Sequence, residues 1–199
     1  MRFYRWPGPA VVLALAFTIS GIESQAVESA IAKGDLEFGD VKFDMPKEWK
    51  AETRLAVVIA HGVRCPVMRQ NYPAFARLMA EYEKRGVGFL FVNGIAQDEA
   101  SEIEAERSRY KLPFVFRDEQ QKLLKELGLK TVGEAVLLEK HDDKWTAQYR
   151  GGISDRVNFD RALEKARNEF LKDAIEDRLS GRNVRNRRGS VFGCSITFR

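Results

Sequence analysis

The most restrictive feature of this sequence is a short apolar run that leads into a glycine-containing break and a Cys-Pro pair. Residues 55–60 read Leu-Ala-Val-Val-Ile-Ala, which is typical of a strand buried on both faces of a sheet. The polar break 61–64 follows, and Pro66 is favoured at the first position of a helix. Apolar residues then recur at helical spacing, and Gly86 is typical of a helix end. The pattern predicts a buried strand, a turn and a helix, with Cys65 at the start of the helix.

The rest of the chain alternates between strand-like and helix-like segments. Strands are predicted at 87–92, 112–116, 134–139 and 145–150, with a weaker one at 36–38, and helices at 98–110, 119–127 and 157–179. A strand–helix–strand unit implies a parallel pair with a right-handed crossover. The polar turn between the last two strands implies an antiparallel hairpin. The predicted fold class is therefore α/β, with a central mixed sheet flanked by helices.

Composition limits the class of protein. A chain of 199 residues that is 44% hydrophobic can build one compact domain, and its formal net charge of +4 is only a mild excess. Two cysteines are too few for a disulfide scaffold or a four-cysteine zinc site.

The amino terminus has the composition of an export signal. Arg2 and Arg5 precede an uncharged apolar run, and Ser24-Gln25-Ala26 supplies small residues at a cleavage site. We expect residues 1–26 to be a signal peptide, 27–179 the folded domain and 180–199 a basic extension that carries Cys194. Export would make the protein periplasmic or secreted, where disulfides persist. Anchoring at a membrane by an uncleaved signal is the alternative.

Cys65 is the strongest functional candidate in the chain. The unpaired backbone N–H groups and the dipole of a helix start favour a thiolate, which is the nucleophilic form of cysteine. Arg64 and Arg69 add positive charge nearby. We expect an exposed, reactive sulfur, and the alternative is an inert buried thiol.

Cys194 is the only other cysteine and so the only possible internal partner. A bridge to Cys65 would close a long loop and stabilise the oxidised chain. The sequence leaves open whether the bridge is a redox couple, a permanent staple or a link between two chains.

Several segments resemble the redoxin group of thioredoxin-like proteins, of the alkyl-hydroperoxide-reductase and thiol-specific-antioxidant type. The segments that carry the resemblance are Val57–Val67, Gly86–Asn93, Leu112–Phe114 with Arg117-Asp118, Glu134–Leu138, Tyr149–Gly151 and Gly193–Ile196. The resemblance implies a thioredoxin-like fold and thiol chemistry at Cys65.

This sequence departs from the patterns of that group at three places. Met68 stands where thioredoxins have the second cysteine of CxxC. Val58 and Gly62 stand where typical peroxiredoxins have Pro and Thr, and the missing hydroxyl weighs against peroxide chemistry. The loop before the third strand, around Val132-Gly133, lacks the proline that is normally cis in this fold, so we expect a trans or altered loop there.

The function that these features predict is that of an exported thiol–disulfide oxidoreductase or peroxiredoxin-like protein without a cofactor. Cys65 would be the nucleophile and Cys194 the resolving cysteine, with Arg64 and, more weakly, Arg117 holding negative charge. Its partners would be a protein thiol or disulfide, an external reductant or a small peroxide.

Two binding functions are the alternatives. Because His61 occupies the place of the first cysteine in the CxxxC motif of cytochrome-oxidase assembly proteins, a copper chaperone could use His61 and Cys65 with Cys194 or His141. A redox-silent thioredoxin-fold module is the other possibility.

Two charged clusters complete the sequence picture. The basic residues Arg182, Arg185, Arg187 and Arg188 lack interleaved aromatic residues, so nucleic acid is not an expected partner. We interpret them as a solvated linker, with an anionic membrane surface or an acidic protein as a possible partner. Glu102, Glu104 and Glu106 are interpreted as the solvated face of a helix.

Overall fold

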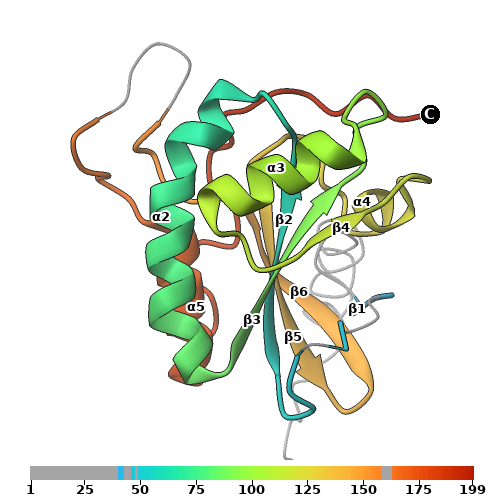
Figure 1. Ribbon diagram of the computed structural model, residues 1–199. Coiled ribbons are helices and arrows are strands. Elements are labelled where there is room, and N and C mark those ends of the chain that lie inside the picture. The colour runs from blue at the N-terminus through green and yellow to red at the C-terminus, as the bar shows by residue number, and fades with distance from the viewer. Residues whose placement is uncertain (1–39, 43–45, 48, 158–162) are drawn as a thin grey trace, which may run out of the picture. The chain divides into compact units, whose positions relative to one another are not determined.

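The computed structural model describes residues 40–42, 46–47, 49–157 and 163–199 (Figure 1). The predicted signal peptide 1–26 and the weak strand at 36–38 lie outside these residues. No helix within the described ranges is long and apolar enough to cross a membrane.

The described residues form one six-stranded mixed sheet in the order β1-β6-β5-β2-β3-β4. Strand β2 pairs in parallel with β3, which pairs in parallel with β4, whereas β5 is antiparallel to both β2 and β6. The strands are β1 (Asp40–Val41), β2 (Leu55–His61), β3 (Val87–Asn93), β4 (Val115–Arg117), β5 (Ala135–His141) and β6 (Lys144–Gly151). The predicted parallel pair and the late hairpin are both confirmed.

Three helices pack together beside the sheet (Figure 1). Helix α2 lies next to α3 through the stacked rings of Tyr72 and Tyr110, whose centroids are 4.1 Å apart. Its far end meets α5 through Tyr82 and Arg85, which both bind Glu176. The helices are α2 (Pro66–Tyr82), continued by the 3₁₀ turn η1 (Glu83–Arg85), then α3 (Ala100–Tyr110), α4 (Lys122–Glu126) and α5 (Phe170–Leu179).

The core is centred on β2 and β3, in which every residue is buried. This burial explains why both strands are almost continuously apolar, since a strand buried on both faces has no polar side facing water. Gly86 ends η1 with a φ of 82°, in the left-handed region predicted for it. The predicted α/β class and the thioredoxin-like arrangement of this sheet and its helices are confirmed.

The final helix is shorter than predicted. Its apolar spacing suggests a helix from 157 to 179, but α5 begins only at Phe170. The Asp155 carboxylate accepts hydrogen bonds from the backbone N–H groups of Arg167 and Asn168, at 2.7 and 3.0 Å. A side chain outside the helix therefore binds the backbone where the extra helical turns were expected.

The segment around β4 and α4 is also more irregular than predicted. Strand β4 covers 115–117 rather than 112–116, and α4 covers 122–126 rather than 119–127. Asp118 accepts hydrogen bonds from the backbone N–H groups of Lys122 and Leu124, at 3.0 and 2.9 Å. This carboxylate fixes where α4 begins.

Candidate functional site

Cys65 lies at the point where β2 passes into α2. It is the residue immediately before the helix, and Pro66 occupies the first helical position, as predicted. The turn between strand and helix is tight, because a side chain at Gly62 would meet those of Ile95 and Val132 at 2.7 Å. Cys65 is only 3% exposed, however, so the expectation of an exposed sulfur is wrong.

Cys194 comes within reach of Cys65 from the other end of the chain. The two sulfur atoms are 2.9 Å apart, about 0.9 Å longer than an S–S bond of about 2.05 Å, and both cysteines are free thiols. Cys194 is partly exposed, so it is the sulfur nearer to solvent. The structure thus brings together the two cysteines that the sequence paired.

The carboxyl-terminal segment 187–199, hereafter the tail, holds Cys194 in place by pairing with the loop before β5. The N–H of Val132 donates to the carbonyl of Cys194 and the N–H of Ile196 donates to the carbonyl of Lys130, both at 2.9 Å. Thr131 and Ser195 form the antiparallel bridge between the two segments. In Figure 1 the tail, drawn in red, passes the start of α2 on its way to the carboxyl terminus.

The environment of Cys194 disfavours the loss of its proton. The pKa of Cys194 is raised to about 11, first by burial and then by its hydrogen bond to the Cys65 sulfur and the charge on that sulfur. Cys194 therefore keeps its proton and donates a hydrogen bond to the Cys65 sulfur. Which of the two thiols acts as the nucleophile stays a prediction.

The loop that normally contains a cis proline in this fold has a different conformation here. The described residues contain no cis peptide bond, so the bonds around Val132 and Gly133 are trans, as expected. Gly133 has a φ of 86°, and its N–H donates to the carbonyl of Ala60 at 2.8 Å. Backbone hydrogen bonds thus connect the loop to β2 and to the tail.

The arginines predicted to support the sulfur have other partners. The Arg64 guanidinium binds Glu102 and lies 3.6 Å from Asp98, and Arg69 binds Glu106 at 3.1 Å. Arg117 lies at the end of β4 and pairs with Glu119 at 3.4 Å. The positive charge of each is thus engaged by a carboxylate.

A buried polar network lies beneath the turn that carries Cys65. His61 is fully buried. The side-chain Oδ1 of Asn93 accepts the N–H of Ile95, so its Nδ2 is the atom that donates to His61 Nδ1, at 3.1 Å. The Nε2 atom therefore carries the proton and donates to the Tyr72 hydroxyl at 3.1 Å. Tyr72 in turn donates to Glu106 at 3.1 Å.

This network favours a neutral His61. Burial lowers the pKa of His61, and the nearby carboxylates of Glu106 and Asp98 oppose that shift only in part. Asn93 also donates to Asp98 at 2.8 Å, and Asp98 accepts the N–H of Val63 at 2.7 Å. The hydrogen bonds thus connect α3 to the turn before Cys65.

Two sequence interpretations of this region are corrected. His61 was expected to be a loop residue but ends β2. Glu106 was assigned to a solvated helix face but is buried, because it accepts hydrogen bonds from both Tyr72 and Arg69.

The copper alternative requires ligand atoms that are free to bind a metal. Both ring nitrogens of His61 take part in the network, and His141 pairs with Glu139 at the end of β5. Among the residues that the structure describes, no three His, Cys, Asp or Glu side chains form a group that could hold a metal ion. The two histidines named for copper are therefore engaged by other groups of the protein.

The basic extension is attached to the domain rather than solvated as a linker. Arg182 and Arg185 both bind the buried carboxylate of Asp177, whose pKa is lowered mainly by the hydrogen bond from Arg185. Arg187 donates to the carbonyl of Ala147 in β6. An anionic surface or an acidic protein as partner stays a prediction.

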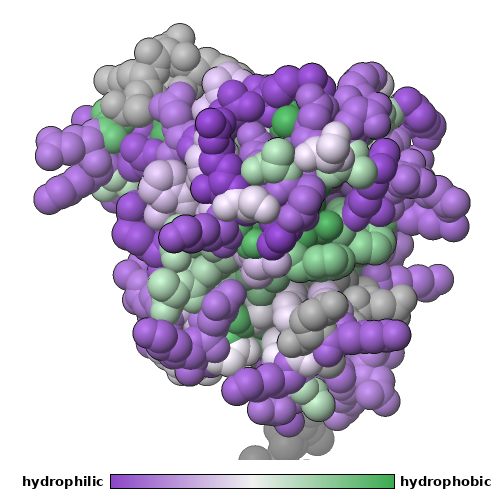
Figure 2. Space-filling model, in the orientation of Figure 1, coloured by the Kyte–Doolittle hydropathy of each residue, from purple (hydrophilic) through white to green (hydrophobic). Residues whose placement is uncertain are grey.

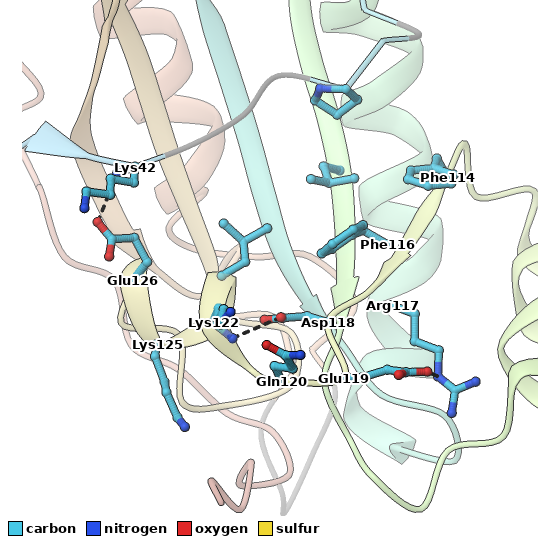
Figure 3. A pocket seen from close by; sticks show the side chains of 13 residues that line it. Lys42, Phe114, Phe116, Arg117, Asp118, Glu119, Gln120, Lys122, Lys125 and Glu126 are labelled. Carbon is cyan, nitrogen blue, oxygen red and sulfur yellow. Dashed lines mark hydrogen bonds and ion pairs between the residues drawn. The ribbon is translucent and has the colours of Figure 1, made fainter.

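A separate cavity of about 1070 Å³ lies beside β4 and α4 and includes neither cysteine (Figure 3). Phe114 and Phe116 line it and are 42% and 40% exposed. Figure 2 shows apolar surface among hydrophilic side chains near β4. Arg117 also lines this cavity.

Sequence reasoning missed the groups that complete the site. The loop residues Lys130–Val132 carry no distinctive side chain, because they act through backbone N–H and carbonyl groups. Gly193 is the one sequence feature that indicates this pairing, because a side chain there would overlap the carbonyl oxygen of Val132. A glycine beside a cysteine can thus indicate that another segment of backbone lies close to the cysteine.

Known proteins share the fold of this chain but little of its sequence. No protein-family model matches the sequence, and no curated protein matches it. An uncharacterized conserved protein from Geobacillus kaustophilus is similar with a TM-score of 0.65 and 21% identity, over 74% of this chain and 78% of that one. A hypothetical protein from Sinorhizobium meliloti 1021 is similar with a TM-score of 0.64 and 19% identity, over 74% of this chain and 81% of that one.

A candidate thiol:disulfide interchange protein DsbE from Chlorobium tepidum is similar with a TM-score of 0.51 and 17% identity, over 71% of this chain and 97% of that one. At these identities the likeness shows the thioredoxin-like fold alone. Function has to be argued from the site itself.

Proposed function

We propose that this protein is a thiol–disulfide oxidoreductase that uses Cys65 as nucleophile and Cys194 as resolving cysteine. The observation that carries the proposal is the 2.9 Å separation of the two sulfurs at the start of α2. The predicted signal at residues 1–26 would export the protein to a compartment where disulfides persist.

The reaction begins when the Cys65 thiolate attacks one sulfur of a disulfide substrate. The substrate S–S bond breaks, the first thiol leaves with a proton, and Cys65 is left in a mixed disulfide. Cys194 then attacks the Cys65 sulfur as a thiolate and releases the second thiol. Two electrons pass from the cysteine pair to the substrate, and an external dithiol reduces the resulting bridge.

The environment of Cys194 supports this order of events. Burial is the largest cause that raises its pKa, and the other two causes are the hydrogen bond to Cys65 and the charge on Cys65. Both are lost once Cys65 is bound in a mixed disulfide, so Cys194 becomes easier to deprotonate when its attack is needed.

A disulfide suits this site better than a peroxide. Peroxiredoxins use a hydroxyl near the thiol, and Gly62 occupies that position here. The side chains of Ile95 and Val132 fill the space that a larger residue would need.

The reaction of the reduced full chain with 5,5′-dithiobis(2-nitrobenzoate) tests the proposal. The wild-type protein should release two equivalents of thionitrobenzoate and end with an internal bridge, whereas Cys194→Ser should release one and keep a stable adduct on Cys65. Cys65→Ser should release at most one equivalent and form no internal bridge, because Cys194 is then the one thiol left in the chain.

Mass spectrometry of the products identifies the modified residue. A redox-silent binding module would leave Cys65 unmodified in the folded protein. That result, or two independent adducts on the wild-type chain, would overturn the proposed function.

A further inference from the structure

The tail occupies the cysteine site in the manner of a short peptide. Its residues Cys194–Ile196 run antiparallel to the loop Lys130–Val132, with two backbone hydrogen bonds of 2.9 Å. Alternate side chains of an extended segment share a face, so Cys194 and Ile196 both point inward. Ile196 is buried and Ser195 is exposed.

The space on the amino-terminal side of the cysteine is closed to side chains. A Cβ atom at Gly193 would overlap the carbonyl oxygen of Val132 and would lie 2.9 Å from Cγ2 of Thr131. The φ of Gly193 does not lie in the left-handed region, so the glycine is required by space rather than by backbone conformation.

The tail also blocks access to the nucleophile. Cys65 is buried, and the sulfur of the partly exposed Cys194 lies 2.9 Å from its sulfur. A polypeptide substrate can reach Cys65 only when this part of the tail moves away. Its departure leaves the carbonyl of Lys130 and the N–H of Val132 without their partners, and an extended peptide can replace both hydrogen bonds.

We infer that the substrates are extended polypeptide segments with the pattern Gly-Cys-any-aliphatic, which bind the Lys130–Val132 loop in place of the tail. The inference rests on the proposed function and names its substrate class. After the mixed disulfide forms, the returning tail brings Cys194 to the Cys65 sulfur and takes back the backbone hydrogen bonds. Resolution and release of the substrate then occur in one movement.

The test uses the full chain with Cys194→Ser, which cannot resolve a mixed disulfide. The probe is the peptide Phe-Gly-Cys-Ser-Ile-Thr, with its cysteine activated as a 2-thiopyridyl disulfide. Three matched peptides carry Ala for Gly, Asp for Ile or Lys for Ser. Release of 2-thiopyridone measures the rate of adduct formation on Cys65.

The Ala and Asp peptides should each react at least about tenfold more slowly than the parent peptide, a difference of about 1.4 kcal/mol. The Lys peptide should react at the parent rate, because the corresponding side chain of the tail is exposed. Equal rates for all four peptides, within a factor of about two, would overturn the inference.

A second variant adds Gly193→Ala to Cys194→Ser, so that the tail no longer fits the loop. The parent peptide should then react about tenfold faster than with Cys194→Ser alone, since its tethered competitor is weakened. Gly181→Ala with Cys194→Ser is the control, because nothing lies within 4 Å of the added methyl group. An unchanged rate in the Gly193 variant would contradict competition by the tail.

The small reagent 2,2′-dithiodipyridine separates the two proposals. If it modifies Cys65 while the peptides show no selectivity, only the substrate inference fails. If it leaves Cys65 unmodified in both variants, the proposed function fails and the inference falls with it.

Discussion

The two cysteines of the site are positioned in different ways. Cys65 is placed by its immediate neighbours, because β2 ends at His61 and α2 begins at Pro66. Cys194 lies 129 positions away along the chain and is placed by backbone pairing with Lys130–Val132. Local sequence is enough to put a thiol at a helix start, whereas its partner depends on how the whole tail packs.

The largest expected effect comes from joining the two regions covalently. A bridge between residues 129 positions apart should raise the free energy of unfolding by about 4–5 kcal/mol, because it restricts the unfolded chain. Urea unfolding of the oxidised and reduced full chain measures the difference.

Cys194→Ser under the same oxidant is the control and should show no gain. An increase below about 1 kcal/mol would mean that the bridge strains the docked tail. Covalent dimers instead of a bridged monomer would contradict an internal pair.

The same contrast explains what the sequence could and could not predict. The buried strands, the start of α2 and the late hairpin follow from apolar patterns and from Pro66 and Gly86, which act over a few residues. The location of Cys65 was predictable for that reason. Its burial was not, because the covering residue comes from the far end of the chain.

Side chains that bind distant backbone or buried partners account for the errors. Asp155 binds the backbone at 167–168 and delays α5, although the apolar spacing continues through that segment. Glu106 belongs to a series of alternating glutamates, yet Tyr72 and Arg69 make it a buried acceptor. In each case a tertiary hydrogen bond overrides a pattern that was correct as a local signal.

The tail can be loosened without altering the residues around Cys65. A side chain at Gly151 would overlap the backbone of Gly189, where the tail crosses the end of β6. Gly151→Ala should therefore lower the free energy of unfolding by about 1–3 kcal/mol and speed alkylation of Cys194 in the folded, reduced protein.

Iodoacetamide labelling with peptide mapping measures the exposure of each cysteine separately. The control is Gly181→Ala, which adds a methyl group in open space at a φ of 70° and should cost only about 1 kcal/mol of backbone strain. Labelling of Cys194 at the wild-type rate in Gly151→Ala would show that this glycine contact does not hold the cysteine in place.

The smallest expected effect concerns the residues that place Cys65 locally. It is the pH dependence of stability that arises from His61, in the polar network beneath Cys65. Burial lowers the pKa of His61 in the folded state, whereas an unfolded histidine titrates near about 6.5. The unfolded chain therefore binds more protons below that pH, and stability should fall as the pH drops below about 6.5 towards the lower pKa of the folded state. One such group contributes at most about 1.4 kcal/mol per pH unit.

Urea unfolding between about pH 5.5 and 8 measures this slope, above the range in which ordinary carboxylates titrate. His61→Asn should be less stable at every pH, because Tyr72 and Asn93 lose a partner, but its stability should depend less on pH. His141→Asn, which changes the exposed histidine at the hairpin, is the matched control. A slope unchanged in His61→Asn would mean that another group accounts for the acid sensitivity. The turn before Cys65 would then not depend on a neutral His61.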